Sequence, residues 1–89
     1  MLDRPSVGPQ ERVSAVVHRM LSDRSITRMV ASDDDLRQAG LSSLDMVNLV
    51  LTIEAEFDVR IPETDITPAN FRSIALISKL VVSLLGGVK

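Results

Sequence analysis

Few side chains in this sequence of 89 residues can do chemistry by themselves. The chain has no cysteine and a single histidine, so it offers no thiolate nucleophile, no disulfide and no multi-histidine metal site. The most promising groups are the hydroxyls of Ser42 and Ser43, which lie where a polar loop meets an apolar, periodic stretch. Such a junction predicts a helix N-terminus, where backbone N–H groups and the positive end of the helix dipole favour a negatively charged group.

Two other sets of reactive side chains lack the pattern that their chemistry requires. The run Asp33–Asp35 could start a calcium loop, but such a loop needs glycine at its sixth position and glutamate at its twelfth, where this chain has Gln38 and Leu44. We interpret the run as a solvated acidic loop. His18 falls on the polar side of an expected helix, and no signature links it to Ser43 as a catalytic dyad. We therefore expect His18 to be a surface residue.

The elements before the serine pair are predicted to be one helix and one long loop. Residues 11–22 have the apolar spacing of an amphipathic helix. Gly8-Pro9 stands just before them, and proline is preset for a first helical turn. Residues 23–42 are mixed and polar, which predicts a long loop with room for one helical turn. A loop of that length is often functional.

The elements after the serine pair are all predicted to be helical. Residues 43–57 form the strongest helix, Thr67-Pro68 opens a short one, and Ser73 caps a last helix that ends at Gly86-Gly87. The inward positions of the last helix would be Ile74, Ile77, Leu80, Val81, Leu84 and Leu85. No segment shows the alternation of a strand. The expected fold is therefore all-α, with three main helices and a short third helix.

The helix expected at residues 43–57 carries two apolar stripes. The first stripe consists of Leu49, Ile53 and Phe57, and the second consists of Leu44, Val47 and Leu51. One helix cannot turn both stripes to the same core. We expect one stripe to face the core, and the other to form a surface for a partner because it is more apolar than a solvated face needs to be.

The net charge of −2 conceals an acidic middle. Residues 31–65 contain two basic and nine acidic side chains, a net charge of −7, whereas both flanking segments are positive. Such a patch could steer a basic partner surface, although charge alone favours an ordinary solvated surface. An acidic chain that is only 2% aromatic also lacks the basic patches and stacking rings of nucleic-acid binding.

The chain is expected to form one domain, at residues 10–86, between a flexible N-terminal tail at residues 1–9 and a C-terminal tail at residues 87–89. Its N-terminal residues lack the apolar region of a secretory signal. The most apolar run, Leu80–Leu85, is far shorter than the roughly 20 residues that cross a bilayer. We expect a cytoplasmic monomer without a membrane span.

The residues around the serine pair form a specific sequence motif. Gly40-Leu41-Ser42-Ser43-Leu44-Asp45 is followed in register by Glu56-Phe57 and Ile61-Pro62, and later by Asn70-Phe71-Arg72. With this pattern the chain resembles the acyl carrier protein family, whose members are phosphopantetheine-binding carrier domains. The resemblance covers residues 11–85 and implies the small four-helix bundle of that family, with a long loop between its first two helices.

The resemblance implies a non-catalytic carrier. Ser43 aligns with the serine that receives 4′-phosphopantetheine from coenzyme A through a Mg²⁺-dependent phosphopantetheinyl transferase. The arm ends in a thiol that carries cargo as a thioester between ligases, synthases or transferases. The first expectation is a discrete acyl carrier of fatty-acid, polyketide or related biosynthesis. The alternatives are an aminoacyl or peptidyl carrier of a peptide-type pathway, and an unmodified helical adaptor protein.

Three positions depart from the family pattern. Ser42 replaces the usual aspartate, and it can still cap the helix together with Asp45, although its negative charge is lost. Asn48 and Ala55 stand where fatty-acid carriers often have glutamate, which indicates dedicated partners. By resemblance, we expect the docking surface for those partners to include Ser42, Leu44, Asp45, Val47, Asn48, Leu51 and Glu54.

Overall fold

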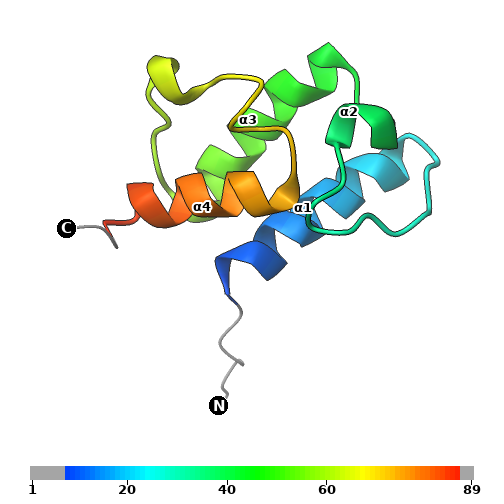
Figure 1. Cartoon of the computed structure of the whole chain (residues 1–89), viewed down its shortest axis with the longest axis horizontal. Helices are drawn as coiled ribbons and strands as arrows, with labels where there is room; N and C mark the ends of the chain where they lie inside the picture. Colours follow the sequence, from blue (N-terminus) through cyan, green and yellow to red (C-terminus); the bar gives the residue numbers. More distant parts are fainter. Residues whose placement is uncertain (1–7, 87–89) are drawn as a thin grey trace.

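The computed structural model describes residues 8–86, and the regular structure in this range is entirely helical. The elements are α1 (Pro9–Asp23), α2 (Leu36–Ala39), α3 (Ser43–Phe57), the 3-10 helix η1 (Glu63–Asp65) and α4 (Ile74–Leu84) (Figure 1). The all-α prediction is confirmed. The predicted tails lie, apart from Gly8 and Pro9, outside the described residues. Within them, no helix combines the length and the apolar character needed to cross a membrane.

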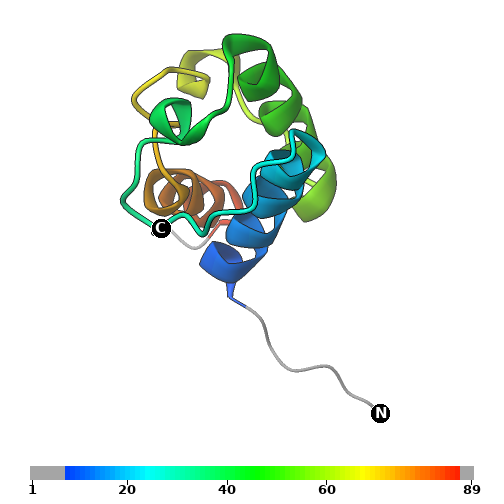
Figure 2. The same ribbon diagram turned by 90° about the vertical axis from the view of Figure 1, so that its right-hand side faces the viewer.

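The core lies where α1 packs against both α3 and α4 (Figure 2). The buried apolar residues of these three helices are Val13, Val16, Val17, Leu21, Leu49, Val50, Ile53, Phe57, Ile74, Ile77 and Val81. Complete burial of one such side chain stabilises a fold by about 1.5–3 kcal/mol. Arg12 adds a contact between α1 and the end of α3, because its guanidinium lies 4.3 Å from the centre of the Phe57 ring and donates to the Glu56 carbonyl at 2.7 Å.

The first helix begins at Pro9, two residues before the predicted start. The Gly8 N–H donates to Glu11 Oε1 at 3.0 Å, which satisfies a backbone donor that the helix itself leaves free. At the other end, α3 stops at Phe57 because Asp58 takes a left-handed conformation with φ 55°. The Val59 N–H then donates to the Glu54 carbonyl at 3.1 Å.

The long loop between α1 and α2 is tied to the helices on both sides. His18 is half-buried, not the surface residue that we expected: its Nε2 accepts from the Val30 N–H at 3.0 Å, and its Nδ1 lies 2.9 Å from the Ser14 carbonyl. These partners place the ring proton on Nδ1. With both ring nitrogens engaged in this way, the imidazole is not available to Ser43 as a base.

The acidic run in this loop is structural rather than simply solvated. Asp34 accepts the Ala31 N–H at 2.9 Å, and Asp35 caps α2 by accepting the N–H groups of Arg37 and Gln38. Aspartate is favoured in such positions because its short carboxylate reaches nearby backbone donors. The single helical turn that the loop had room for is α2 itself.

The short third helix is displaced from its predicted position. The expected helix at Thr67-Pro68 is only a turn, in which Thr67 Oγ1 accepts the Asn70 N–H at 3.1 Å. The regular element lies earlier, at η1. Thr67 caps this turn, but the predicted helix does not form, because Phe71 enters the core and Ser73 starts α4 too soon for a helix to continue.

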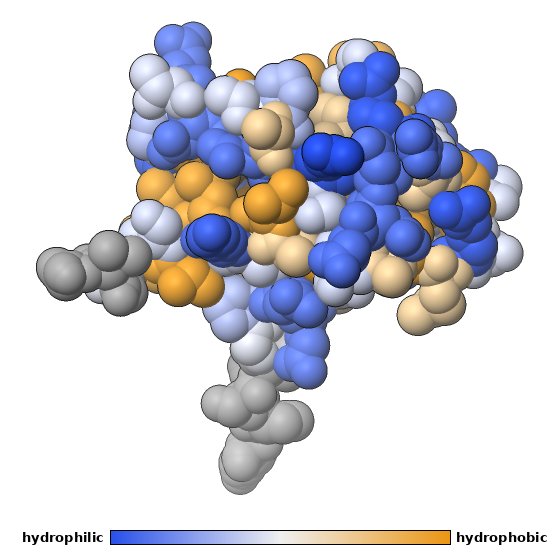
Figure 3. Space-filling view, viewed as in Figure 1, coloured by the Kyte–Doolittle hydropathy of each residue, from blue (hydrophilic) through white to orange (hydrophobic). Residues whose placement is uncertain are grey.

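The last helix has the predicted cap, since Ser73 Oγ accepts the Leu76 N–H at 3.2 Å. Gly86 follows it with φ 82°, a conformation that favours glycine. Leu85 was predicted to face inward, and this prediction is wrong because the residue is exposed. Apolar surface gathers over α4 in Figure 3. The exposed large apolar residues of α4 and its C-cap are Leu76, Val82 and Leu85.

Candidate functional site

The turn that leads into α3 depends on Gly40. This residue ends α2 with φ 130°, and a Cβ at this position would lie 2.5 Å from Ile26 Cδ1. Glycine alone adopts this conformation readily and leaves room for the isoleucine. Leu41 is then buried, so the chain is anchored immediately before the serine pair. Gly40 therefore lets the chain turn tightly into α3.

The two adjacent serines have different structural roles. Ser42 is the N-cap: its Oγ accepts the Asp45 N–H at 3.1 Å, and its own N–H donates to Asp45 Oδ2 at 2.9 Å. The predicted capping box is therefore confirmed. Ser43 is the first residue of α3 and is exposed. Within residues 8–86, the N–H groups of Ser43 and Leu44 have no hydrogen-bond partner.

Asp45 is not part of the exposed surface on which we expected it. The residue is only 5% exposed, and its Oδ1 accepts from Arg24 Nη2 at 2.6 Å and from Arg24 Nε at 3.2 Å. The hydrogen bond from the Ser42 backbone, and then those from Arg24, hold the pKa of this carboxyl below its ordinary value. The negative charge of Asp45 is thus neutralised inside the fold.

The buried carboxylate predicts a specific acid sensitivity. Because the folded pKa is lowered, the stabilisation is complete above the unfolded pKa of about 4 and is lost as the pH falls through the lower folded pKa. We expect Asp45→Asn to cost about 2 kcal/mol of unfolding free energy at pH 7, the range for a hydrogen bond to a charged group. Urea unfolding at pH 7 and at pH 2 measures this, and the difference from wild type should shrink at pH 2.

The matched control for this prediction is Asp33→Asn, which removes the same charge from an exposed loop position. We expect its effect at pH 7 to stay within about 0.5 kcal/mol. Equal stability losses in the two variants would contradict the role given to Asp45.

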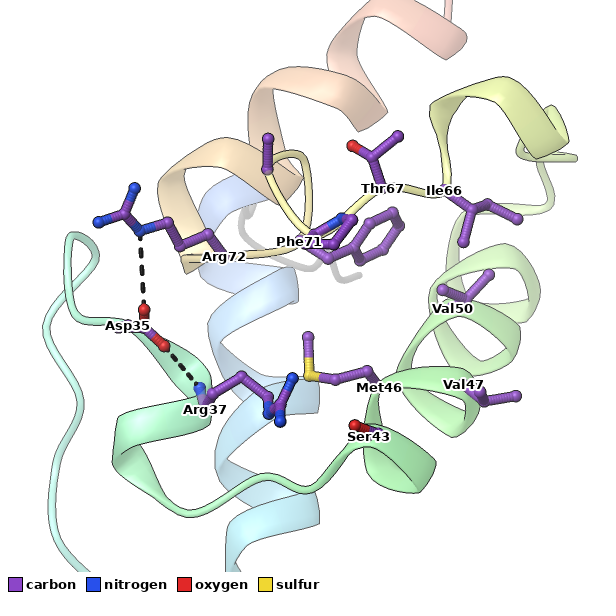
Figure 4. A pocket seen from close by; sticks show the side chains of 12 residues that line it. Asp35, Arg37, Ser43, Met46, Val47, Val50, Ile66, Thr67, Phe71 and Arg72 are labelled. Atoms are coloured by element: carbon purple, nitrogen blue, oxygen red, sulfur yellow. Dashed lines mark hydrogen bonds and ion pairs between the residues drawn. The ribbon is translucent and has the colours of Figure 1, made fainter.

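A half-open cavity of about 470 Å³ adjoins Ser43 (Figure 4). It lies between the start of α3, α2 and the segment from η1 to α4. The lining residues include Arg37, Met46, Val50, Ile66, Phe71 and Arg72. Most of this surface is apolar, with the two arginines and Asp35 on one side. Ser43 and a cavity of this size therefore lie together, an arrangement that the sequence pattern did not predict.

The second stripe of α3 is exposed, as the resemblance implies for the docking surface; the two-stripe pattern alone predicts only that one of the stripes faces away from the core. Leu44, Val47 and Leu51 are 68%, 56% and 58% exposed, whereas Leu49 and Ile53 of the first stripe are completely buried. An apolar row of this kind on a small domain indicates a contact surface. Ser42 and Asn48 are exposed beside it. The structure therefore brings five of the seven predicted docking residues to one surface.

Glu54 is the second predicted docking residue whose charge is engaged within the chain. It is half-buried, and its Oε2 accepts the Ile61 N–H at 2.8 Å, near the opposite end of α3 from Ser43. Glu56 likewise pairs with Arg12 at 3.1 Å. Together with Asp45, they are three of the nine acidic residues in the acidic middle, and each of these three carboxylates is bonded within the fold.

The site fits a phosphate-linked arm on Ser43. The hydroxyl is exposed, two backbone N–H groups at the helix start are free within the described residues, and the cavity opens beside them. Free N–H groups at a helix N-terminus bind phosphate well. The sequence pattern indicated Ser43 as a candidate site residue. It gave no signal that Arg37, Met46 and Val50 line the cavity, because these residues belong to no motif. For Phe71, the segment Asn70-Phe71-Arg72 was an available signal.

Comparisons with known proteins show which family and which relatives this chain resembles. Residues 12–81 match the family model for a phosphopantetheine attachment site. Aminoacyl carrier protein 2 of Bradyrhizobium diazoefficiens is 40% identical over 81 residues, which cover 91% of each chain. Aminoacyl carrier protein 1 of the same organism is 38% identical over 76 residues, which cover 85% of this chain and 84% of that relative.

Two solved structures are also similar to this chain in their fold. One is the Bradyrhizobium japonicum glycine:[carrier protein] ligase complexed with glycylated carrier protein, with a TM-score of 0.76 and 35% identity over 81% of this chain and 96% of that chain. A second complex of this ligase, with its cognate carrier protein and an analogue of glycyl adenylate, gives a TM-score of 0.78 at 35% identity, over 84% of this chain and 96% of that chain. A covalently attached 4′-phosphopantetheine is the prosthetic group that the matched family implies. The chain belongs to the phosphopantetheine-binding carrier protein family.

Proposed function

We propose that this chain is a non-catalytic aminoacyl carrier protein that holds 4′-phosphopantetheine on Ser43. The observation that carries the proposal is the position of Ser43: an exposed hydroxyl at the first residue of α3, within a family defined by such an attachment site. When bound, the group supplies a terminal thiol on which an acyl group is held as a thioester. The chain itself supplies the anchor, the docking surface and the cavity beside the anchor.

Attachment requires a phosphopantetheinyl transferase, because no carboxylate or imidazole among residues 8–86 forms a hydrogen bond with the Ser43 hydroxyl. The Ser43 oxygen replaces the adenosine 3′,5′-bisphosphate leaving group of coenzyme A on phosphorus, and the hydroxyl proton passes to a base of the transferase. The N–H groups of Ser43 and Leu44 are in place to bind the resulting phosphodiester. The neutral cap Ser42 adds no carboxylate that would repel it.

The relatives favour amino acids over fatty acids as cargo. The first expectation from sequence was a fatty or polyketide acyl chain, with an amino acid as the alternative. The curated relatives at 38–40% identity are named aminoacyl carrier proteins, and the structural neighbours are bound to a glycine-activating ligase. The missing aspartate at Ser42 and the Asn70-Phe71-Arg72 text point the same way. We propose an amino acid, loaded by a separate ligase.

We propose that the ligase binds the exposed stripe of α3. Leu44, Val47 and Leu51 form an apolar row that begins next to Ser43, and Asn48 lies on the same side. Because Asp45 and Glu54 are engaged inside the chain, apolar contact rather than attraction to acidic side chains would provide the binding energy. This differs from the basic partner surface that the acidic middle suggested.

The cargo class can be tested with the phosphopantetheinylated protein. It is incubated with ATP, Mg²⁺ and an extract of the source cells, which contains the matching ligase, and with either a mixture of amino acids or a mixture of fatty acids. Intact mass should increase by one aminoacyl group in the first mixture, and hydroxylamine should remove that group. Boiled extract is the control. Loading from fatty acids alone would contradict the proposed cargo.

A further inference from the structure

Arg37 is a cation that lines the same cavity as Ser43 and forms no ion pair within residues 8–86. The residue lies on α2, is exposed, and lines the same cavity as Ser43. Figure 4 shows its side chain extending from α2 toward the start of α3, on the side where Ser43 and Met46 lie. Among residues 8–86, its guanidinium forms no ion pair, whereas Arg12, Arg24 and Arg72 each have a carboxylate partner.

The nearest carboxylate in sequence is already engaged. Asp35 Oδ1 accepts the backbone N–H groups of Arg37 at 2.8 Å and of Gln38 at 3.2 Å, and its Oδ2 lies 3.6 Å from Arg72 Nε. These contacts fix the backbone of Arg37 at the first turn of α2. They also leave the Arg37 guanidinium directed toward the cavity and not toward its own cap.

The surroundings of Ser43 are therefore positive. The N–H groups of Ser43 and Leu44 are free within the described residues and lie at the positive end of the α3 dipole. The one carboxylate in the first turn of α3, Asp45, is neutralised by Arg24. Where the family usually has aspartate, Ser42 is uncharged. An anion on Ser43 would meet three donor groups and no competing free carboxylate in this turn.

We propose that Arg37 binds the phosphodiester of the arm on Ser43 and is a positioning residue for it. The inference rests on the proposed attachment at Ser43. A guanidinium forms a strong, often bidentate, charge-assisted pair with phosphate oxygens. The pair fixes the first segment of the arm at the mouth of the cavity, so that the arm starts between α2 and α3. The ligand class is a phosphodiester monoanion, and the arginine recognises its oxygens independently of the cargo.

The test compares Arg37→Gln with Arg60→Gln. Glutamine has a similar helix propensity and remains polar, but it is shorter and removes the charged guanidinium. Arg60 is also exposed and lies beyond the opposite end of α3, about 20 Å of helix from Ser43 at 1.5 Å per residue. Wild type and both variants are prepared with and without the arm, and intact mass establishes attachment in each.

Three readouts then report the contact. In wild type, the ¹⁵Nε resonance of Arg37 should shift when the arm is attached, and the ³¹P resonance of the phosphodiester should move as NaCl is raised to screen the pair. The armed protein should unfold about 2–4 °C above the unarmed protein, the shift expected for a single exposed ion pair in a domain of this size. Arg37→Gln should reduce both the salt-dependent ³¹P shift and the thermal difference, leaving only the contribution of the backbone N–H groups, and Arg60→Gln should keep both at the wild-type size.

The outcomes separate this proposal from the one on which it rests. If wild type gains no phosphopantetheine on Ser43, both proposals are overturned. If attachment is normal but the Arg37 Nε resonance is unchanged, the arginine contact alone is overturned. The same holds if Arg37→Gln matches wild type in both the ³¹P shift and the thermal difference. The Nε measurement needs no variant, so it decides the matter even if Arg37→Gln is poorly folded.

Discussion

Replacing Ser43 with alanine should abolish phosphopantetheine attachment and leave the fold intact. The hydroxyl is the only proposed acceptor, and no hydrogen bond to a described residue depends on it. Alanine is also a good helix former at the first turn of α3. Incubation with coenzyme A, Mg²⁺ and a broad-specificity phosphopantetheinyl transferase should therefore raise the intact mass of wild type by one phosphopantetheine and leave that of Ser43→Ala unchanged.

The adjacent serine is a closely matched control. Ser42→Ala removes the cap of α3, because Ser42 Oγ accepts the Asp45 N–H, and it should cost about 1 kcal/mol of unfolding free energy. It should still accept the arm, since Ser43 remains. Urea unfolding and intact mass thus give opposite patterns for the two variants. Arm attachment to Ser43→Ala, or its loss in a folded Ser42→Ala, would overturn the assignment of the two roles.

The second large expected effect is a difference in stability between substitutions on the two faces of α3. Leu49 is completely buried, so Leu49→Ala should lower the unfolding free energy by about 3 kcal/mol, through lost burial and the cavity that remains. Leu51 is 58% exposed, so Leu51→Ala should change stability by less than about 0.5 kcal/mol. The two substitutions remove the same atoms from positions only two residues apart. Urea unfolding of both variants measures the difference.

In the loading reaction, Leu51→Ala should be impaired more than Leu49→Ala, which is the reverse of their order in stability. As part of the proposed docking row, Leu51 is expected to contribute about 1–2 kcal/mol to ligase binding, which corresponds to roughly a tenfold increase in KM for the loading reaction. We expect that increase in Leu51→Ala with little change in kcat. Leu49→Ala, assayed at a temperature where it is folded, should load like wild type. An unchanged KM in Leu51→Ala would place the ligase elsewhere on the surface.

Much of the fold follows from periodicity in the sequence. The two apolar stripes on residues 43–57 predict that α3 has one buried and one exposed apolar face, because helix geometry fixes which residues share a face. The family resemblance, and not periodicity, implies which of the two is exposed. Local caps at Ser42 and Ser73 and the conformation of Gly40 are predictable for the same reason: they depend only on near neighbours in the chain. The short helix was misplaced because the core, through Phe71, decides where that segment turns.

Electrostatics at the site could not be predicted in this way. Asp45 and Arg24 are 21 residues apart, and Glu56 meets Arg12 across 44 residues, so the pattern along the chain cannot show that these charges are paired. The same reason explains Arg37, which looks ordinary in the sequence and becomes distinctive only when α2 is folded beside Ser43. The acidic segment predicted a charged surface for a partner, whereas the folded chain also exposes the apolar residues Leu44, Val47 and Leu51 beside Ser43, the proposed attachment site.

The most direct test of the central claim is mass spectrometry of the protein isolated from the cells that produce it. Peptides that contain residue 43 should carry one phosphopantetheine on Ser43, with an amino acid on the thiol that hydroxylamine releases. A fatty acyl group in that position would contradict the proposed cargo. An unmodified Ser43 in cells whose other carrier proteins are modified would contradict the carrier role itself.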